Sequence, residues 1–548
     1  MNPLILRGIR ENLRIKHLVA AGLFSLIVSS TVYMTAFLNG SEGKYTYDKE
    51  TQEWGRGEPS DINGARNAFP YLLALQGFYL MFLGTGRVAS ITAEERESGL
   101  LDYQRMTPMN PLSKIVGYIF GIPAREYYMF LFTLPFLLHC VIMGQLPWSN
   151  ILHLYAVFFS CVILYHLTAH SVGLVVPKPR AASWVSRIAV LGLYVALPGF
   201  GQAGISFLSF LTILPTYFGK ILPILKFEDQ NKLGRFESKA VEFWQDIPFF
   251  NLEISPSAFT FFMQALLILT FLITAYRKWR NQSLPAFSKP SGLLLFSIFQ
   301  FLLLGSLWPF FAKGQASGLL GESLSANAFG FHDAAVVFIL VQSIFLGLSI
   351  FAILTLCNIC CPNQHLFIKG LQRAEKLALP RVPHGADERS GIWFVCLLSI
   401  ITGGIYMIFL FLAHDSGIWK IPSIGLNATL LPLLGLLATA LYLQASRELW
   451  FNLGFWGFVG LLWITPLLAS MVLAVGWEEE YLDIILKLLA LNPISIISLH
   501  LITEYSDWLR VPTDYLHHFN EAYWFGLATC LLLALSLQIR LQLKRKQK

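Results

Sequence analysis

The sequence predicts an all-α, polytopic integral membrane protein with about twelve transmembrane helices. Of its 548 residues, 55% are hydrophobic and only 13% are charged, about half the charged fraction of a soluble domain. The hydrophobic residues form long runs. Residues 18–38, for example, contain no Asp, Glu, Lys or Arg, and about 20 apolar residues cross a bilayer as a helix. This composition leaves too little polar surface for a water-soluble globular protein.

We expect the spans to form two groups of six. The first group is expected near residues 18–38, 69–88, 116–143, 150–175, 183–204 and 257–276. The second is expected near 292–312, 334–357, 391–412, 424–445, 452–475 and 521–540. The domains are then an interfacial helix at 1–17, one six-span half at 18–283 and another at 284–548.

The charges of the connecting segments predict the orientation. With the N-terminus inside the cell, Lys and Arg are about twice as frequent in the inside segments as in the outside ones, and Asp and Glu show the reverse. Basic residues resist translocation. We therefore expect a multi-pass protein of the cell (inner) membrane with both termini in the cytoplasm.

The two halves share a layout. Each has an inside loop between its second and third spans, at 89–115 and 358–390, and a long outside segment before its last span, at 205–256 and 476–520. This pattern indicates a parallel duplication of topology. Any twelve spans divide into two groups of six, however, so chance division stays open as an alternative.

The N-terminal segment predicts an amphipathic helix. Residues 3–16 place apolar side chains on one face and Arg7, Arg10 and Arg14 on the other. Such a helix lies in the membrane interface with its basic face toward anionic headgroups. The lipid bilayer itself is therefore an expected partner.

The inside loop 89–115 has strong local signals. Thr92 and Glu95 have the spacing of a capping box, which predicts a helix beginning at Ala93. Gly99 can end or bend this helix, and Asn110-Pro111 is typical of the start of the next one.

The same loop carries apolar residues where a plain connection needs none. Leu100, Leu101, Tyr103 and Met106 offer an apolar surface outside the bilayer. This surface predicts either a docking site for a partner or a helix lying on the membrane.

At this point the sequence resembles a known family. Residues 2–14 resemble the opening elbow helix of ABC transporter permeases of the second exporter type, and residues 94–102 and 107–113 look like that family's inside loop after its second span. In that family the loop is the coupling helix, which docks in a cleft of the ATPase subunit. The resemblance implies that ATPase coupling falls to Glu94, Glu95, Arg96, Glu97, Gly99, Leu100 and Leu101.

The resemblance also implies a function. The chain would be the permease of an ABC exporter, moving an unidentified substrate with ATP hydrolysed on a separate ATPase subunit. The sequence has no Gly-x-x-x-x-Gly-Lys-Ser/Thr motif, so we expect no nucleotide site, cofactor or catalytic residue in this chain. No nucleic-acid partner is expected.

The chain departs from the family in its length. The usual permease has six spans and pairs with a second, so the pathway here is formed either by the two halves of one chain or by a homodimer. The second inside loop contains only a short echo of the coupling motif, at residues 386–391.

A few other polar residues fall within the expected spans. Arg125 and Glu126 lie in the third span and His166 and His170 lie four apart in the fourth. They are candidates for the transport pathway, or for an interfacial ion pair and a packed histidine pair. We expect no metal site there, or at Cys357, Cys360 and Cys361, because no third histidine ligand is evident and buried cysteines commonly pack as small hydrophobes. Gly117-x-x-x-Gly121 predicts close packing of one helix on another.

Two other functions stay open as alternatives. An ion-coupled secondary transporter of two six-span halves needs several ionisable groups at mid-membrane depth. A membrane-embedded enzyme using His166 and His170 needs a clustered polar site. The sequence shows neither clearly.

Overall fold

The computed structural model describes residues 2–12, 15–42, 45–47, 54–56, 59–195, 206–225, 247–282, 285–314, 331–379, 382–383, 385–419, 426–450, 452–475, 481–509 and 511–546. Within these residues, eleven helices are long and apolar enough to cross a membrane. The remaining expected span, 183–204, is represented by the helix α10 (Pro179–Val195), and its last residues lie outside the described part. The chain is an all-α, polytopic membrane protein of about twelve spans.

The chain divides into two compact units. Unit 1 comprises residues 1–202, 206–247 and 252–283, and unit 2 comprises the rest. The main boundary falls between residues 283 and 284, where the sequence separates the two six-span halves.

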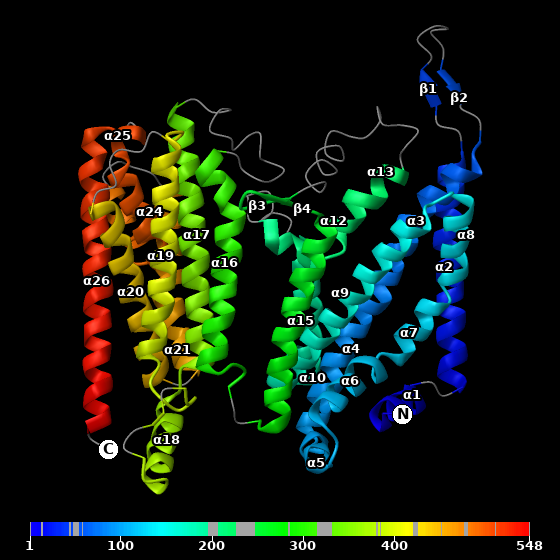
Figure 1. Cartoon of the computed structure of the whole chain (residues 1–548), viewed down its shortest axis with the longest axis horizontal. Helices are drawn as coiled ribbons and strands as arrows, with labels where there is room; N and C mark the ends of the chain where they lie inside the picture. Colours follow the sequence, from blue (N-terminus) through cyan, green and yellow to red (C-terminus); the bar gives the residue numbers. More distant parts are fainter. Residues whose placement is uncertain are drawn as a thin grey trace. The chain divides into compact units, whose positions relative to one another are not determined.

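Unit 1 begins with a short helix and continues with its spans (Figure 1). Its first elements are α1 (Pro3–Asn12), α2 (Ile15–Ser41), β1 (Tyr45–Tyr47), β2 (Trp54–Arg56), α3 (Asp61–Gly77), the π-helical η1 (Phe78–Gly84), α4 (Thr85–Glu97) and α5 (Leu100–Met106). They are followed by α6 (Pro111–Gly121), α7 (Ala124–Leu131), α8 (Leu134–Met143), α9 (Trp148–Val175) and α10. The unit ends with η2 (Ser206–Leu211), α12 (Leu214–Thr216), η3 (Tyr217–Ile221), α13 (Leu222–Leu225), β3 (Ile247–Phe249), which straddles the unit boundary, β4 (Leu252–Ile254) and α15 (Pro256–Arg280).

The second and third spans of unit 1 are built differently. The second is one 37-residue helix, Asp61–Glu97, because α3, η1 and α4 join without a break. The third is interrupted at Pro123, which lacks an amide hydrogen, between α6 and α7.

The core of unit 1 has two buried clusters, one mainly between α3, η1, α8 and α9 and the other mainly between α4, α6, α9 and α15. α4 packs on α9 and α10, α9 packs on α15, and α1 packs on α6. Figure 1 shows α1 and α5 at the same end of this unit. We call this end of unit 1 the elbow end.

Unit 2 contains the remaining spans. Its elements are α16 (Lys289–Lys313), α17 (Phe331–Cys360), α18 (Gln364–Lys376), α19 (Ile392–Ser416), α20 (Leu426–Leu449), α21 (Asn452–Val459), η5 (Gly460–Ile464), α22 (Thr465–Val475), α23 (Leu482–Leu489), α24 (Pro493–Glu504), α25 (Ser506–Leu509) and α26 (Thr513–Lys546). α24 is apolar but has only 12 residues, too few to cross a bilayer. It packs against α17, α20 and α26, so this part of the segment 476–520 folds onto the bundle.

The two units share three pairings of corresponding spans. The first span packs on the third (α2 on α7, α16 on α19), the second on the fourth (α4 on α9, α17 on α20) and the fourth on the sixth (α9 on α15, α20 on α26). In each unit a short helix from the preceding segment also packs on the sixth span, α12 in unit 1 and α24 in unit 2. Parallel duplication and a chance division of twelve spans both stay open as interpretations of these shared contacts.

Candidate functional site at the elbow end of unit 1

The helix α1 is fastened to α6 by backbone-to-backbone packing. A Cβ atom added at Gly117 would lie 2.5 Å from Cβ of Leu4, and one added at Gly8 would collide with the carbonyl oxygen of Gly121. Asn2 Nδ2 also donates to the carbonyl oxygen of Ser113 at 2.5 Å. The predicted close packing at Gly117-x-x-x-Gly121 is confirmed, and the partner is the N-terminal helix.

Glu95 joins four helices at this end. Its side chain is buried, and its Oε1 lies 2.9 Å from Arg7 Nη2 of α1. Its Oε2 accepts hydrogen bonds from the hydroxyl of Tyr118 on α6 and, at 3.3 Å, from Nε2 of Gln104 on α5. A buried carboxylate is tolerated because these donors replace the water it has lost. Glu95 therefore faces the interior of the chain and is not available to a partner.

The predicted capping box is wrong. Thr92 and Glu95 both lie inside α4, which continues from the second span to Glu97, so no helix begins between them. Thr92 Oγ1 instead lies 3.1 Å from Nδ1 of His170. The tertiary contacts of both side chains replace the local capping contacts that their spacing favours.

The other two local signals are confirmed. α4 ends before Gly99, which has a φ of +76°, a left-handed conformation that favours glycine. Asn110 caps α6 by accepting from the amide of Leu112 at 3.0 Å, and Pro111 occupies the first helical position.

The helix α5 is anchored to two further elements. Lys114 Nζ on α6 donates to the carbonyl oxygen of Gln104 at 2.6 Å and lies 5.6 Å from the ring centre of Trp279 on α15. Arg105 donates from Nη2 to the carbonyl oxygen of Lys278 on α15 at 3.2 Å. Burial, and secondarily the nearby charge of Arg105, lower the pKa of Lys114, which lies outside the spans.

The outer side of this region is exposed. Leu101 is fully buried, so the expectation that it belongs to a docking surface is wrong, and Leu100 is only half-buried. Tyr103 and Met106 are 65% and 77% exposed. We define the elbow surface as the outward-facing residues Glu94, Glu97, Leu100, Asp102, Tyr103 and Met106.

The remaining expected elbow residues are distributed differently from the sequence prediction. Arg7 pairs with Glu95 and, at 2.8 Å, with Glu11, so it does not simply face headgroups. Arg10 is exposed, Arg96 is half-buried, and Arg14 lies outside the described residues.

The histidine pair is internal. His166 Nε2 lies 2.9 Å from the carbonyl oxygen of Leu80, in the π-helical η1, and its Nδ1 lies 3.2 Å from the carbonyl oxygen of Ile119. His170 Nε2 accepts from Nε1 of Trp279 at 2.9 Å. Because both histidines are fully buried and both rings face hydrogen-bond partners, they tie α9 to neighbouring helices. No group of three potential metal ligands occurs among the described residues.

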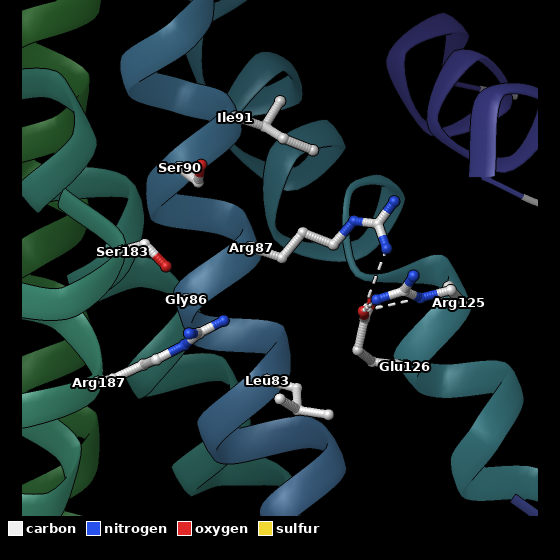
Figure 2. Close-up of a pocket in the computed structure, with 9 residues that line it drawn as sticks. All are labelled: Leu83, Gly86, Arg87, Ser90, Ile91, Arg125, Glu126, Ser183 and Arg187. Atoms are coloured by element: carbon white, nitrogen blue, oxygen red, sulfur yellow. Dashed lines mark hydrogen bonds and ion pairs between the residues drawn. The ribbon is translucent and has the colours of Figure 1, made fainter. Parts of the chain in front are cut away.

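We call the contacts among Arg7, Glu95, Gln104 and Tyr118 the elbow network. A cavity of about 350 Å³ lies beside it. Figure 2 shows its charged residues, Arg87, Arg125, Glu126 and Arg187. Glu126 is buried and its Oε1 lies 2.9 Å from Arg125 Nη2 and 3.2 Å from Arg87 Nη1. The expected Arg125–Glu126 pair therefore forms, and it lines this cavity, whereas His166 and His170 do not. We call this cavity the arginine cavity. Its other lining residues are Leu83, Gly86, Ser90, Ile91 and Ser183.

The loop between the second and third spans of unit 2 is different. It contains the amphipathic helix α18, an element that was not among those expected from the sequence. The exposed charges of α18 are mostly basic: Lys369, Arg373 and Lys376, with Glu375 as the acidic exception. In the segment 386–391, the amide of Gly391 donates to Glu448 Oε1 at 2.7 Å, and Lys289 Nζ donates to the carbonyl oxygen of Asp387 at 2.9 Å.

Several residues of the site could not be found from the sequence. Gln104, Lys114, Tyr118 and Trp279 anchor α5, and Arg87 and Arg187 line the cavity. The one available signal was the presence of Arg87 and Arg187 inside or at the edge of apolar runs, where charged residues are costly.

Comparison with known proteins found no match: no family model, no curated protein and no solved structure is similar to this chain.

Proposed function

We propose that this chain is the permease subunit of an ABC exporter and that its elbow surface docks on a separate ATPase subunit. The elbow end would face the cytoplasm, with both termini on that side of the cell (inner) membrane. ATP would be bound and hydrolysed by the partner, and the chain would move a substrate whose chemistry is not defined by this site.

The observation that supports the proposal best is the two-sided character of α5. Its outer side exposes Tyr103 and Met106, while its inner side is tied to α4 through Gln104 and Glu95, to α6 through Lys114, and to α15 through Arg105. A push on the outer side would therefore reach three spans at once, since the connections are direct hydrogen bonds between packed helices. A simple interhelical loop does not need these connections.

The composition of the elbow surface suits a protein partner. Tyr103 and Met106 supply an apolar contact that a groove could desolvate. Glu94, Glu97 and Asp102 surround it, and such peripheral charges favour correct orientation more than affinity. The complementary groove would be apolar at its centre and basic at its rim.

The alternatives have less support. In the described part of the chain, His166 and His170 are both engaged in internal hydrogen bonds and no third ligand accompanies them, which disfavours a histidine-dependent enzyme. The charged cavity is lined by Arg87, which precedes the elbow end of α4 at Glu97 by ten residues, whereas the sites of ion-coupled transporters lie near the bilayer midplane.

The test is a double substitution on the elbow surface. Tyr103→Asp with Met106→Asp places two charges in the proposed contact, and burying unpaired charges costs several kcal/mol. Because both side chains are exposed, insertion and folding should be retained. Leu101 is unsuitable for this test because its burial would confound loss of docking with loss of folding.

The measurement is ATP hydrolysis that co-purifies with the tagged chain from native membranes. Wild type should carry a P-loop ATPase and turn over ATP, and the double variant should lose both. Leu252→Asp is a matched control, since Leu252 is 65% exposed and lies on β4, outside the spans. If the double variant retains the ATPase as the control does, the elbow surface is not its docking site.

A further inference from the structure

We propose that the arginine cavity binds a phosphate group, supplied by the headgroup of a membrane lipid at the elbow end or by a soluble phosphate-bearing ligand. This site is separate from the elbow surface, and the proposal does not depend on the chain being an ABC permease. Three observations support it: the net positive charge of the lining residues, the contacts that position Arg187, and the place of the cavity along α4.

The charge of the cavity is unbalanced. Three arginines and one glutamate line it, and a guanidinium is positively charged at any physiological pH. Glu126 uses one oxygen, Oε1, for both Arg87 and Arg125. The lining thus carries a net charge of two positive units, and positive charge next to a low-dielectric bundle favours a bound anion.

Arg187 is held in place without an acidic partner. Its Nε is buried and has no hydrogen-bond partner in the described part of the chain. Its guanidinium lies 5.5 Å from the ring centre of Phe82 and 5.9 Å from that of Trp184. A Cβ atom at Gly86 would collide with Nε of Arg187, so glycine allows this guanidinium to rest against the α4 backbone beside the cavity (Figure 2).

The remaining lining suits a phosphate. Arginine binds phosphate through paired N–H donors, and the hydroxyl groups of Ser90 and Ser183 lie at the same cavity and can donate to further oxygens. Liquid water takes about 30 Å³ per molecule. The cavity of about 350 Å³ therefore has room for a phosphate together with part of the group that carries it.

The depth of the cavity suits a lipid headgroup. Arg87 precedes the end of α4 at Glu97 by ten residues, or about 15 Å along the helix axis. The helix Asp61–Glu97 has 37 residues and is about 55 Å long, whereas the hydrocarbon core is about 30 Å thick. A centred helix of this length extends beyond the hydrocarbon by about 12 Å at each end. Arg87 then lies near the hydrocarbon edge, from where a long arginine side chain can reach toward the headgroup phosphates.

The lipid arm of the test uses the whole chain in nanodiscs of phosphatidylcholine with and without phosphatidylglycerol or phosphatidic acid. Native mass spectrometry after release should show preferential retention of the anionic lipids. Arg187→Gln should weaken their retention on the order of tenfold, as expected for loss of one charge-assisted interaction. Gly86→Ala, which displaces Arg187 without removing its charge, should weaken it in the same direction.

The matched control is Arg180→Gln. Arg180 is an exposed arginine on the same helix, α10, and does not line the cavity, so its loss should leave lipid retention at the wild-type level. Unfolding temperatures measured in phosphatidylcholine alone establish that each variant is folded.

The soluble arm titrates inorganic phosphate into protein in phosphatidylcholine nanodiscs and follows the unfolding temperature. Stabilisation in wild type that is lost in Arg187→Gln, without anionic-lipid retention, would support a soluble phosphate-bearing ligand. Lipid retention without phosphate stabilisation would support a headgroup. The proposal is wrong if Arg187→Gln matches wild type and Arg180→Gln both in its retention of anionic lipid and in its stabilisation by phosphate.

Discussion

At the scale of single residues, Glu95 shows how a side chain of an apparent surface motif is used internally. It belongs to an acidic and basic run of the kind expected on a solvated helix, yet it is buried and meets Arg7, Gln104 and Tyr118. Its neighbours Glu94 and Glu97 are exposed. Glu95 therefore has a structural role inside the chain, whereas Glu94 and Glu97, on the exposed side of α4, can contact a partner.

This difference predicts unequal effects on stability. Glu95→Gln removes the charge that Arg7 and the other donors stabilise and should lower the free energy of unfolding by about 2 kcal/mol. Glu97→Gln, on the exposed side, should change it by less than about 0.5 kcal/mol. Chemical denaturation in detergent micelles measures both. Equal stability of the two variants would show that the buried network contributes little.

At the scale of elements, the N-terminal helix α1 is packed into unit 1 and is not a detached membrane anchor. Gly8, Gly117 and Gly121 bring α1 and α6 into backbone contact, and Arg7 links α1 to α4 through Glu95. The elbow end thus combines an apolar, glycine-lined contact with one ion pair. Both would have to break before α1 could leave the bundle.

A larger side chain at the contact should release α1. A Cβ atom added at Gly121 would already lie 3.0 Å from both Cα of Ile5 and the carbonyl oxygen of Leu4. Gly121→Val adds two methyl groups beyond that Cβ. Since the contacted atoms of Ile5 and Leu4 belong to the backbone, the helix itself must move. Hydrogen exchange of the α1 amides should become faster while that of α9 stays unchanged.

The control for this variant is Gly192→Ala on α10. A Cβ at Gly192 would have no atom within 4 Å, so exchange of α1 should match wild type. Unchanged exchange in Gly121→Val as well would contradict the proposed role of the contact.

At the scale of the whole molecule, the two units share their pairing of first with third, second with fourth and fourth with sixth spans. Their exposed helices between second and third spans differ in charge, since the elbow surface is acidic and α18 is mainly basic. The two units thus present two unlike surfaces. A partner that recognised one of them would not recognise the other by the same charges.

The orientation of the whole molecule can be tested with epitope insertions. The excess of Lys and Arg in the predicted inside segments favours cytoplasmic placement of insertions after residues 98 and 378 and outside placement after residues 230 and 478. Accessibility to antibody before and after permeabilisation measures this. A cytoplasmic signal at residue 230 would exclude the twelve-span orientation with both termini inside.

The sequence alone determined the features that depend on near neighbours in the chain. The spans follow from apolar run length, the end of α4 from Gly99, the start of α6 from Asn110-Pro111, and the capacity of α6 for close packing from Gly117-x-x-x-Gly121. Each of these signals acts over about one helical turn or along one helix, so no knowledge of other helices is needed.

Only the tertiary structure decided which side chains face inward and what they meet. Leu101 is buried, Thr92 contacts His170, and Arg187 joins Glu126 at one cavity. These outcomes depend on the rotation of α4, α9 and α10 against one another, and the residues involved are separated by many tens of positions along the chain. Helical periodicity defines the faces of each helix, but packing against other helices determines which face is buried and which charged groups it meets. The elbow network and the arginine cavity both result from this packing.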